Sequence, residues 1–199
     1  MLTAIYVDID DFCKENHEII LNHLKASGLV KKNHPSRLTL SEVMTIMVYY
    51  HHSHYKNFKY YYLEYVSQNL RGDFPDLVSY HRFVELIPRA LLALFMYQKY
   101  RCSLSKRTGI YYVDSSRLEA CHPKRVHQNK VMKGIAGWGK SSMGWFYGFK
   151  YHLVVNNLGE IMNVYLSSGN KADNNVKILF YLTNNLSGAL FGDRGCLLY

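Results

Sequence analysis

The sequence has no long apolar run, and this absence argues against a membrane-spanning helix. Its longest uninterrupted apolar stretch, residues 90–97, is far shorter than the roughly 20 residues that a bilayer requires. The first residues include Asp8, Asp10 and Asp11 instead of a basic segment followed by an apolar one, so no export signal is expected. The sequence therefore predicts a soluble, cytoplasmic protein.

Cysteine is also scarce, and its spacing indicates neither a disulfide framework nor a zinc site. The four cysteines are scattered and form no C-x-x-C pair. We expect free thiols in a reducing compartment at Cys13, Cys102, Cys121 and Cys196. A histidine cluster at residues 51–54 has no cysteine or carboxylate at ligand spacing, so zinc binding is not expected there.

Acidic residues are nearly missing from one quarter of the chain. Residues 101–150 carry 10 Lys and Arg against 2 Asp and Glu, whereas residues 1–100 carry 11 against 10 and residues 151–199 carry 3 against 3. Most of the net charge of +9 therefore lies in one block. Such a block attracts polyanions, because each cation that meets a phosphate releases counterions. A solvated basic loop without a partner is the alternative.

The first hundred residues show helical patterns. Thr39 and Glu42 have the spacing of a capping box, and the apolar residues that follow lie on one face of a helix over residues 39–50. Further helices are predicted over residues 11–27, 58–69 and 76–97, the last with a kink or break at Pro88. We expect a helical, possibly DNA-binding domain over residues 1–105.

Short strand patterns replace the helical ones after residue 103. A first strand is predicted over residues 110–113, ending on Asp114, and a loop without clear periodicity over residues 115–142. Two strands over residues 145–155 and 161–166 are joined by a hairpin signal. A helix over residues 174–182 and a short strand over residues 189–191 complete the pattern.

Two aspartates follow apolar runs in this second half. Asp114 comes after Tyr-Tyr-Val and Asp193 comes after Leu-Phe-Gly, so each is expected at the end of a central strand. Two neighbouring carboxylates repel each other unless a divalent cation lies between them. Phosphodiester chemistry uses such sites, with two metal ions about 3.5–4 Å apart. For either aspartate alone, a turn or strand-end cap is the more common role.

Four segments carry a family resemblance across residues 110–195. They are YYVDSS at 111–116, WFYGFKYHLVVNNLGEI at 145–161, SSGNKADN at 167–174 and ALFGDRG at 189–195. In order and spacing they resemble the catalytic core of insertion-sequence transposases of the DDE superfamily. The resemblance implies an RNase H-like fold, with Asp114 and Asp193 as the first two catalytic, metal-binding carboxylates. It also implies Mg²⁺ or Mn²⁺ in a two-metal site.

The implied reaction is metal-dependent cleavage at transposon ends, followed by transfer of the exposed 3′ hydroxyl to target DNA. The implied partners are double-stranded DNA, from terminal repeats and target, and a second copy of the chain, in the nucleoid of a bacterial cytoplasm. The fold class is α+β or α/β, with the helical domain followed by an incomplete RNase H-like domain over residues 106–199. Relatives carry a third carboxylate, a glutamate, well after the second aspartate, and residues 194–199 contain none. We therefore expect a polypeptide of residues 1–199 to be catalytically inactive or nearly so.

The basic block acquires a role within this resemblance. Six cations are predicted to contact DNA phosphates near Asp114, namely Arg117, Lys124, Arg125, Lys130, Lys133 and Lys140. Two alternatives stay open. One is a non-catalytic DNA-binding remnant or an inhibitor of transposition, and the other is a different RNase H-like nuclease, such as a resolvase.

Overall fold

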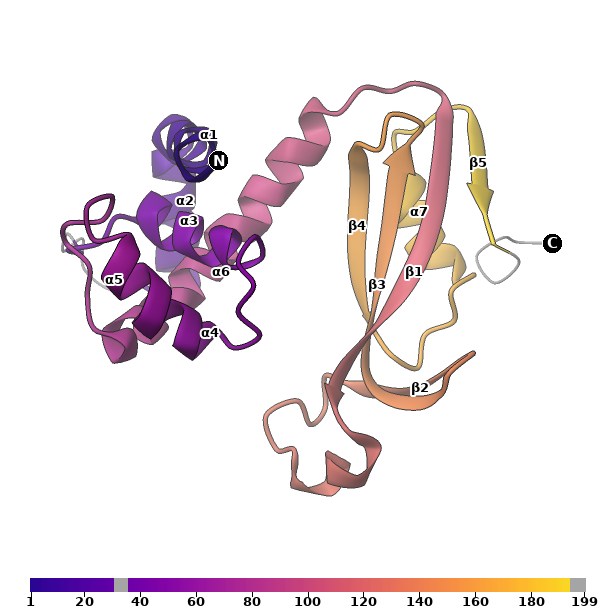
Figure 1. Cartoon of the computed structure of the whole chain (residues 1–199). Coiled ribbons are helices and arrows are strands. Elements are labelled where there is room, and N and C mark those ends of the chain that lie inside the picture. The colour runs from indigo at the N-terminus through magenta and orange to yellow at the C-terminus, as the bar shows by residue number, and fades with distance from the viewer. Residues whose placement is uncertain (31–35, 194–199) are drawn as a thin grey trace. The chain divides into compact units, whose positions relative to one another are not determined.

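The computed structural model describes residues 1–30 and 36–193 and divides into two compact units. The first unit is Met1–Gln98 and the second is Lys99–Tyr199 (Figure 1). Helices build the first unit and a mixed sheet dominates the second, so the chain combines helix and sheet as predicted. Cys196 lies outside the described residues, whereas Cys13, Cys102 and Cys121 are free thiols. Among the described helices, none combines the length and the apolarity that crossing a membrane requires.

The first unit opens with two helices where one was predicted over residues 11–27. α1 (Leu2–Glu15) and α2 (His17–Ala26) are separated by Asn16, whose side-chain amide donates to the Phe12 carbonyl at 3.0 Å. This bond closes the last turn of α1 and lets the chain restart. α3 (Leu40–Tyr50) confirms the predicted helix: the Thr39 amide donates to Glu42 Oε2 at 2.6 Å, and the Glu42 amide donates to Thr39 Oγ1 at 3.2 Å.

Of the remaining helices, the run over residues 58–69 has the predicted bounds, whereas the last helix differs from its prediction. α4 (Phe58–Tyr60), the π-helix η1 (Tyr61–Val66) and α5 (Ser67–Asn69) form the helical run predicted over residues 58–69. α6 (Tyr80–Leu104) begins four residues later than predicted and continues through Pro88, which does not end it. Buried side chains on both sides of the proline, Leu86 and Ala90, hold the helix against the core.

Tyrosines fill much of the core of the helical unit. Tyr61 and Tyr62 are almost completely buried, and their hydroxyl groups donate to the carbonyls of Ile46 at 3.1 Å and Val78 at 2.6 Å. Burial raises the pKa of Tyr62 to about 12. A buried phenol that has a carbonyl partner supplies apolar area without leaving a polar group unsatisfied. These tyrosines therefore stabilise the fold and are not available to a partner.

The second unit is built on a five-stranded sheet (Figure 1). Its strands are β1 (Ile110–Cys121), β2 (Gly137–Ser141), β3 (Gly144–Asn156), β4 (Ile161–Ser168) and β5 (Ala189–Gly192). β3 pairs antiparallel with β1 along one edge, and β2 and β4 share its other edge. β5 pairs in parallel with the other side of β1. The first and last strands of the unit are thus neighbours.

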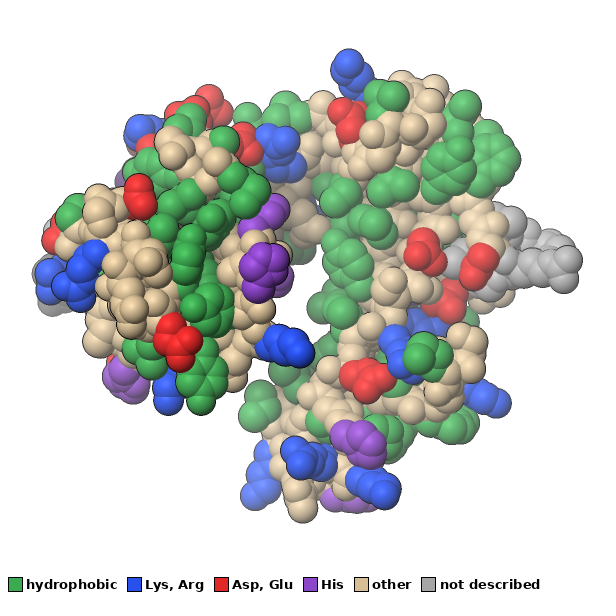
Figure 2. Space-filling view, in the orientation of Figure 1, with side chains coloured by type: hydrophobic (Ala, Val, Ile, Leu, Met, Phe, Trp, Pro, Cys, Tyr) green, Lys and Arg blue, Asp and Glu red, His purple; other side chains and the backbone are tan. Residues whose placement is uncertain are grey.

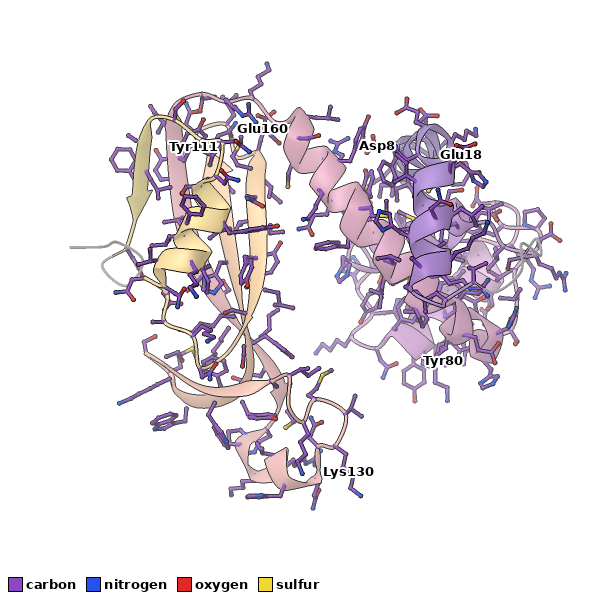
Figure 3. The ribbon with its side chains drawn as sticks, turned by 180° about the vertical axis from the view of Figure 1, so that it is seen from behind. Asp8, Glu18, Tyr80, Tyr111, Lys130 and Glu160 are labelled. Carbon is purple, nitrogen blue, oxygen red and sulfur yellow. The ribbon has the colours of Figure 1, made fainter. Side chains whose placement is uncertain are left out.

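One helix covers one face of this sheet. α7 (Val176–Thr183) begins at Asn175, whose Oδ1 accepts from the amides of Lys177 and Ile178. Figure 3 shows α7 lying against the strands. The core between helix and sheet consists of Tyr111, Val113, Val154, Met162, Ile178, Leu179 and Leu182. Side chains that alternate with these on β1 point to the opposite face.

The loop predicted over residues 115–142 is wrong. β1 does not end at Asp114 but continues to Cys121, the 3₁₀-helix η2 (Pro123–Gln128) follows, and β2 lies within the predicted loop. The second half of β1 is polar, so it has no apolar alternation to reveal a strand, and its pairing with β3 fixes it instead. Glycines let the strands cross closely: a Cβ on Gly148 would lie 2.0 Å from the Leu118 carbonyl oxygen.

Candidate active site

Asp114 and Asp193 lie side by side at the end of the parallel strand pair. The last paired residues of β1 and β5 are Val113 and Gly192, and each aspartate is the next residue of its chain. One step earlier, Tyr112 pairs with Phe191, and their rings are 5.8 Å apart on the exposed face. Side chains two residues apart in a strand share a face. Asp114 therefore emerges on the face opposite α7, and Asp193 follows the neighbouring strand at the same end of the pair.

The two aspartates differ in their backbone setting. Asp114 sits within β1, where its exposed carboxylate accepts a hydrogen bond from the Ser115 amide at 2.8 Å. Asp193 directly follows β5, as predicted. Across the residues that the structure describes, no group of three or more His, Cys, Asp or Glu could hold a metal ion. The geometry therefore offers a pair of carboxylates, not a complete metal cage.

Glu160 has a structural role away from this pair. It lies in the turn between β3 and β4, where its carboxylate accepts from the Lys106 amide at 2.9 Å and from Asn156 Nδ2 at 2.7 Å. The Lys106 amide and the Asn156 side chain lower the pKa of Glu160. Figure 3 shows Glu160 at the end of the sheet where Tyr111 lies. Glu160 thus ties the turn to the segment that leads into β1.

A polar network lies behind Asp114, on the face that α7 covers. Asp173 Oδ1 accepts from Ser115 Oγ at 2.6 Å and from Lys150 Nζ at 2.9 Å. The side chains of Lys150 and Asp173 are only 11% and 29% exposed, so water screens this ion pair weakly. Ser115 is the residue after Asp114, and Lys150 lies on β3. The network therefore fixes the segment after β4 to the strand that carries the first carboxylate.

Sequence reasoning missed this network. A lysine in a predicted strand can face either side of it, and Lys150 is one of the buried residues of β3. A signal was present: even-numbered positions of β3 carry Phe146, His152 and Val154, and Lys150 shares their register. A lysine on the interior face of a strand needs a buried anion, and the SSGNKADN segment supplies it as Asp173.

His152 borders the same network and is almost fully buried. Its Nε2 lies 2.9 Å from Ser167 Oγ, and the Tyr165 ring packs 6.4 Å away. Burial lowers the pKa of His152; Asp173 opposes this shift and Lys150 adds to it. The folded state therefore favours the neutral imidazole.

We expect this histidine to make stability fall in mild acid. The unfolded chain takes up the proton at an ordinary histidine pKa, whereas the folded chain resists it, so stability is complete above that pKa and declines as pH falls through it. Urea unfolding measured between about pH 5 and pH 8 should show a smaller slope of unfolding free energy against pH for His152→Gln than for the parent chain. The exposed His127→Gln is the matched control, and an equal slope in both variants would contradict the assignment.

The predicted DNA-binding residues occupy different places. Lys124, Arg125, Lys130, Lys133 and Lys140 are all exposed, on η2, on the turn after it or on β2. Figure 2 shows Lys and Arg side chains gathered over this part of the unit, and Figure 3 shows Lys130 at the end of the unit far from Tyr111. Arg117 instead shares the α7 face of β1, where it pairs with Glu119 at 3.3 Å and donates to Ser141 Oγ at 3.0 Å.

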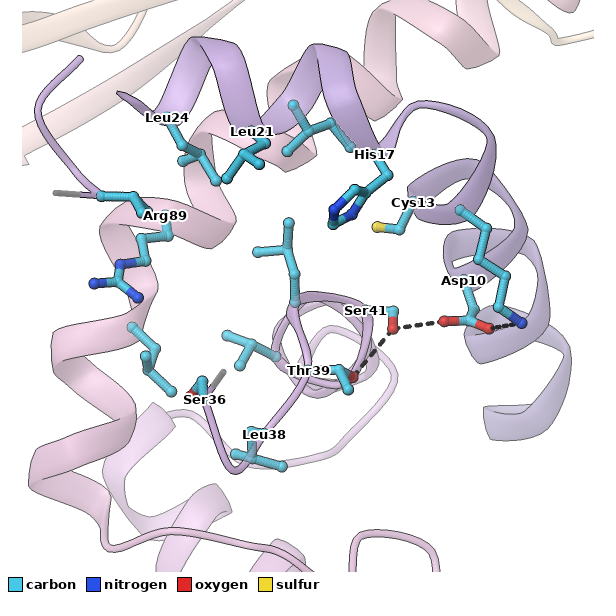
Figure 4. A pocket seen from close by; sticks show the side chains of 16 residues that line it. Asp10, Cys13, His17, Leu21, Leu24, Ser36, Leu38, Thr39, Ser41 and Arg89 are labelled. Carbon is cyan, nitrogen blue, oxygen red and sulfur yellow. Dashed lines mark hydrogen bonds and ion pairs between the residues drawn. The ribbon is translucent and has the colours of Figure 1, made fainter. Parts of the chain in front are cut away.

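A cavity of about 550 Å³ opens in the helical unit (Figure 4). Its walls are mainly apolar side chains of α1, α2, α3 and α6, and its polar rim includes Asp10, which pairs with Lys14 at 2.6 Å and accepts from Ser41 at 2.7 Å. Burial, and then the Asp10 charge, raise the pKa of Cys13 to about 11. Cys13 is therefore a protonated, weakly nucleophilic thiol at neutral pH.

Comparison with known protein families gives a match that lies within the second unit. Residues 104–198 match the model of a family described as a transposase DDE domain. No curated protein and no solved structure gives a significant match. The matched segment contains both aspartates, the network around Asp173 and the six predicted DNA-binding cations.

Proposed function

Because residues 104–198 match the transposase DDE domain family, we propose that Asp114 and Asp193 are the metal-binding carboxylates of a DNA-cleaving transposase core. The observation that carries this proposal is the parallel pairing of β1 with β5, which brings two aspartates 79 residues apart in sequence to the same end of the strand pair. Both residues are exposed.

The donor set fits a hard divalent cation. Mg²⁺ prefers oxygen ligands and is commonly held by one or two carboxylates, with water and substrate phosphates completing its shell. Asp114 and Asp193 supply oxygen donors only, and both lie at the surface, where a phosphate can approach. A bound divalent cation would activate the attacking oxygen and stabilise the leaving one. The chain itself contributes position, through the β1–β5 register and the Ser115 amide that orients Asp114.

The strand order supports an RNase H-like assignment. If β2 is set aside as an insertion, Asp114 lies on the first strand of the unit and Asp193 directly follows the fourth. The RNase H-like fold that the resemblance implies has its first two catalytic carboxylates at these positions. The connection from β4 to β5 passes through α7, which allows β5 to run parallel to β1.

The basic region supports DNA as the substrate. Between Glu119 and Glu160 the sequence contains no acidic residue, and five exposed cations lie on η2, the turn and β2. We infer that Lys124, Arg125, Lys130, Lys133 and Lys140 contact phosphates, and that Arg117 helps through its hold on Ser141. Binding should therefore weaken steeply as salt concentration rises.

The test is metal binding by the polypeptide of residues 1–199. Calorimetric titration with Mn²⁺ should show saturable binding that Asp114→Asn and Asp193→Asn each weaken about tenfold or more, because each removes one of two anionic ligands. Asp76→Asn, at an exposed carboxylate of the helical unit, is the control and should bind as the parent does. Unchanged Mn²⁺ affinity in both site variants would refute the assignment.

A second candidate is a DNA-binding protein without catalysis, which the exposed cations favour. One assay of binding and cleavage, with end-labelled DNA in Mn²⁺, distinguishes the two candidates. Salt-dependent binding without cleavage supports the second for the polypeptide of residues 1–199. Metal-dependent cleavage supports the first.

A further inference from the structure

Both tryptophans of the chain lie on one hairpin, which we call the tryptophan hairpin (residues 137–148, β2 and the first part of β3). Trp138 is on β2 and Trp145 on β3, and the sequence contains no other. They are 42% and 63% exposed, and Met143 in the connecting turn is 79% exposed. Indole rings carry the largest apolar surface of any side chain, so leaving two of them in water is costly unless a partner covers them.

The tryptophan hairpin continues the face that carries Asp114. Asp114 pairs with Leu153 of β3, and side chains at odd positions from 153 down to 145 lie on the same side of that strand. Cross-strand pairing then adds Trp138 opposite Tyr147 and Lys140 opposite Trp145. Eight residues separate Leu153 from Trp145, at most about 26 Å at 3.3 Å per residue. That is less than one turn of B-DNA, about 34 Å.

The exposed rings are held in place from below. Trp138 packs edge-on against Tyr147, with ring centroids 5.6 Å apart, and the Tyr147 hydroxyl donates to the Met132 carbonyl at 3.4 Å. Phe146, fully buried, lies beneath Gly139, where a Cβ would be 2.6 Å from its ring. A preformed platform loses little entropy when a flat ligand stacks on it.

The charges around the rings suit an anionic ligand. Lys140 Nζ lies 6.0 Å from the Trp145 ring centroid, and the hairpin belongs to the stretch of the chain without acidic residues. Flat aromatic surfaces next to ammonium groups are the combination that binds single-stranded nucleic acid, because rings stack on bases while cations meet phosphates. In duplex DNA the base faces are already stacked on each other, so an indole has no face to cover.

We propose that the tryptophan hairpin binds unpaired DNA bases, by stacking on Trp145 and Trp138 with Lys140 on the adjoining phosphate. This inference rests on the proposed function for DNA as the ligand. It adds that the substrate has unpaired nucleotides within one helical turn of the aspartate pair. The alternative is that this exposed apolar hairpin joins two copies of the chain, and measurements of DNA binding and sedimentation distinguish the two roles.

The test uses intrinsic fluorescence, because all tryptophan emission of the chain comes from this hairpin. A short single-stranded oligonucleotide of mixed sequence should quench the emission at saturation, whereas the blunt duplex of the same sequence should quench it little. Measured by anisotropy of a labelled strand, Trp145→Leu should weaken single-strand binding about tenfold. Trp145→Phe should restore most of that loss, since phenylalanine also stacks.

The matched control is Phe180→Leu, which removes an exposed aromatic ring on α7, outside the hairpin. It should leave single-strand affinity unchanged. Equal losses for single-stranded and duplex DNA in Trp145→Leu, or no loss for either, would overturn the proposal. So would a Trp145→Leu variant whose only change is from dimer to monomer in sedimentation, because that outcome assigns the hairpin to self-association.

Failure here is distinguishable from failure of the proposed metal site. Asp114→Asn with Asp193→Asn should abolish Mn²⁺ binding and leave quenching by single-stranded DNA intact. Trp145→Leu should do the reverse. A chain that binds Mn²⁺ normally but shows no quenching would retain the proposed function and lose this inference.

Discussion

Gly148→Ala is expected to cost about 3 kcal/mol of unfolding free energy or more, because no side chain fits where β1 and β3 cross. A Cβ at this position would lie 2.0 Å from the Leu118 carbonyl oxygen and 2.8 Å from the Ala120 amide nitrogen. Both neighbours are backbone atoms of a paired strand, so neither can move without breaking the ladder next to the Glu119–Cys121 irregularity. Urea unfolding followed by tryptophan fluorescence measures the loss, since Trp145 is on β3 and Trp138 is on β2, which pairs with β3.

Alanine substitutions at two other glycines provide reference values for this loss of stability. Gly159 has open space around it but a φ of +79°, so alanine there should cost only about 1 kcal/mol through backbone strain. Gly72 has open space and no such φ, so alanine should be neutral or slightly stabilising. The expected order of loss is Gly148 first, then Gly159, then Gly72. A Gly148→Ala variant no less stable than Gly159→Ala would show that the strands cross less closely than described.

Asp173→Ala is expected to destabilise the chain by about 2–4 kcal/mol, because it leaves the Lys150 ammonium buried without its anion. The lower part of that range reflects the 29% exposure of Asp173, which lets some water reach the vacated space. The variant also removes the acceptor of Ser115 Oγ, next to Asp114. Chemical denaturation of parent and variant gives the loss directly.

The double variant Lys150→Met with Asp173→Ala makes this prediction specific. Replacing the lysine by an apolar side chain of similar length removes the uncompensated charge, so the double variant should be more stable than Asp173→Ala alone. Lys177→Met, which removes a lysine from the exposed first turn of α7, is the control and should change stability by less than about 0.5 kcal/mol. Additive losses in the double variant would mean that the two side chains do not depend on each other.

Sequence patterns predicted the elements that have a local cause. The Thr39–Glu42 capping box fixes the start of α3 within four residues of chain, and the hairpin between β3 and β4 is encoded by its turn. β5 was found because an apolar run ends on Asp193. In each case the residues that determine the element are neighbours in sequence.

Elements that depend on distant contacts escaped prediction. The second half of β1 is polar and is a strand only because β3 pairs with it. β2 has a local partner, the start of β3 across residues 142–143, but its glycine- and lysine-rich segment has no apolar alternation to reveal it. The aspartate pair was anticipated from two separate strand ends, whereas the partner of Lys150 lies 23 residues away and only the fold brings them together. The roles of Asp114, Asp193 and the six cations stay predictions.

The pairing of β1 with β5 also has a consequence for the order of folding. Ile110 pairs with Ala189, so β1 cannot pair with β5 until a segment 79 residues later has been synthesised. By contrast, β3 and β4 can form their hairpin as soon as both have been synthesised. Contacts so far apart in sequence form late, since a long loop must close before they bring any gain. Asp114 and Asp193 can therefore come together only after residues 189–192 have been synthesised and have paired with β1. Until then, β1 has β3 as a neighbour but lacks the strand that leads into the second aspartate.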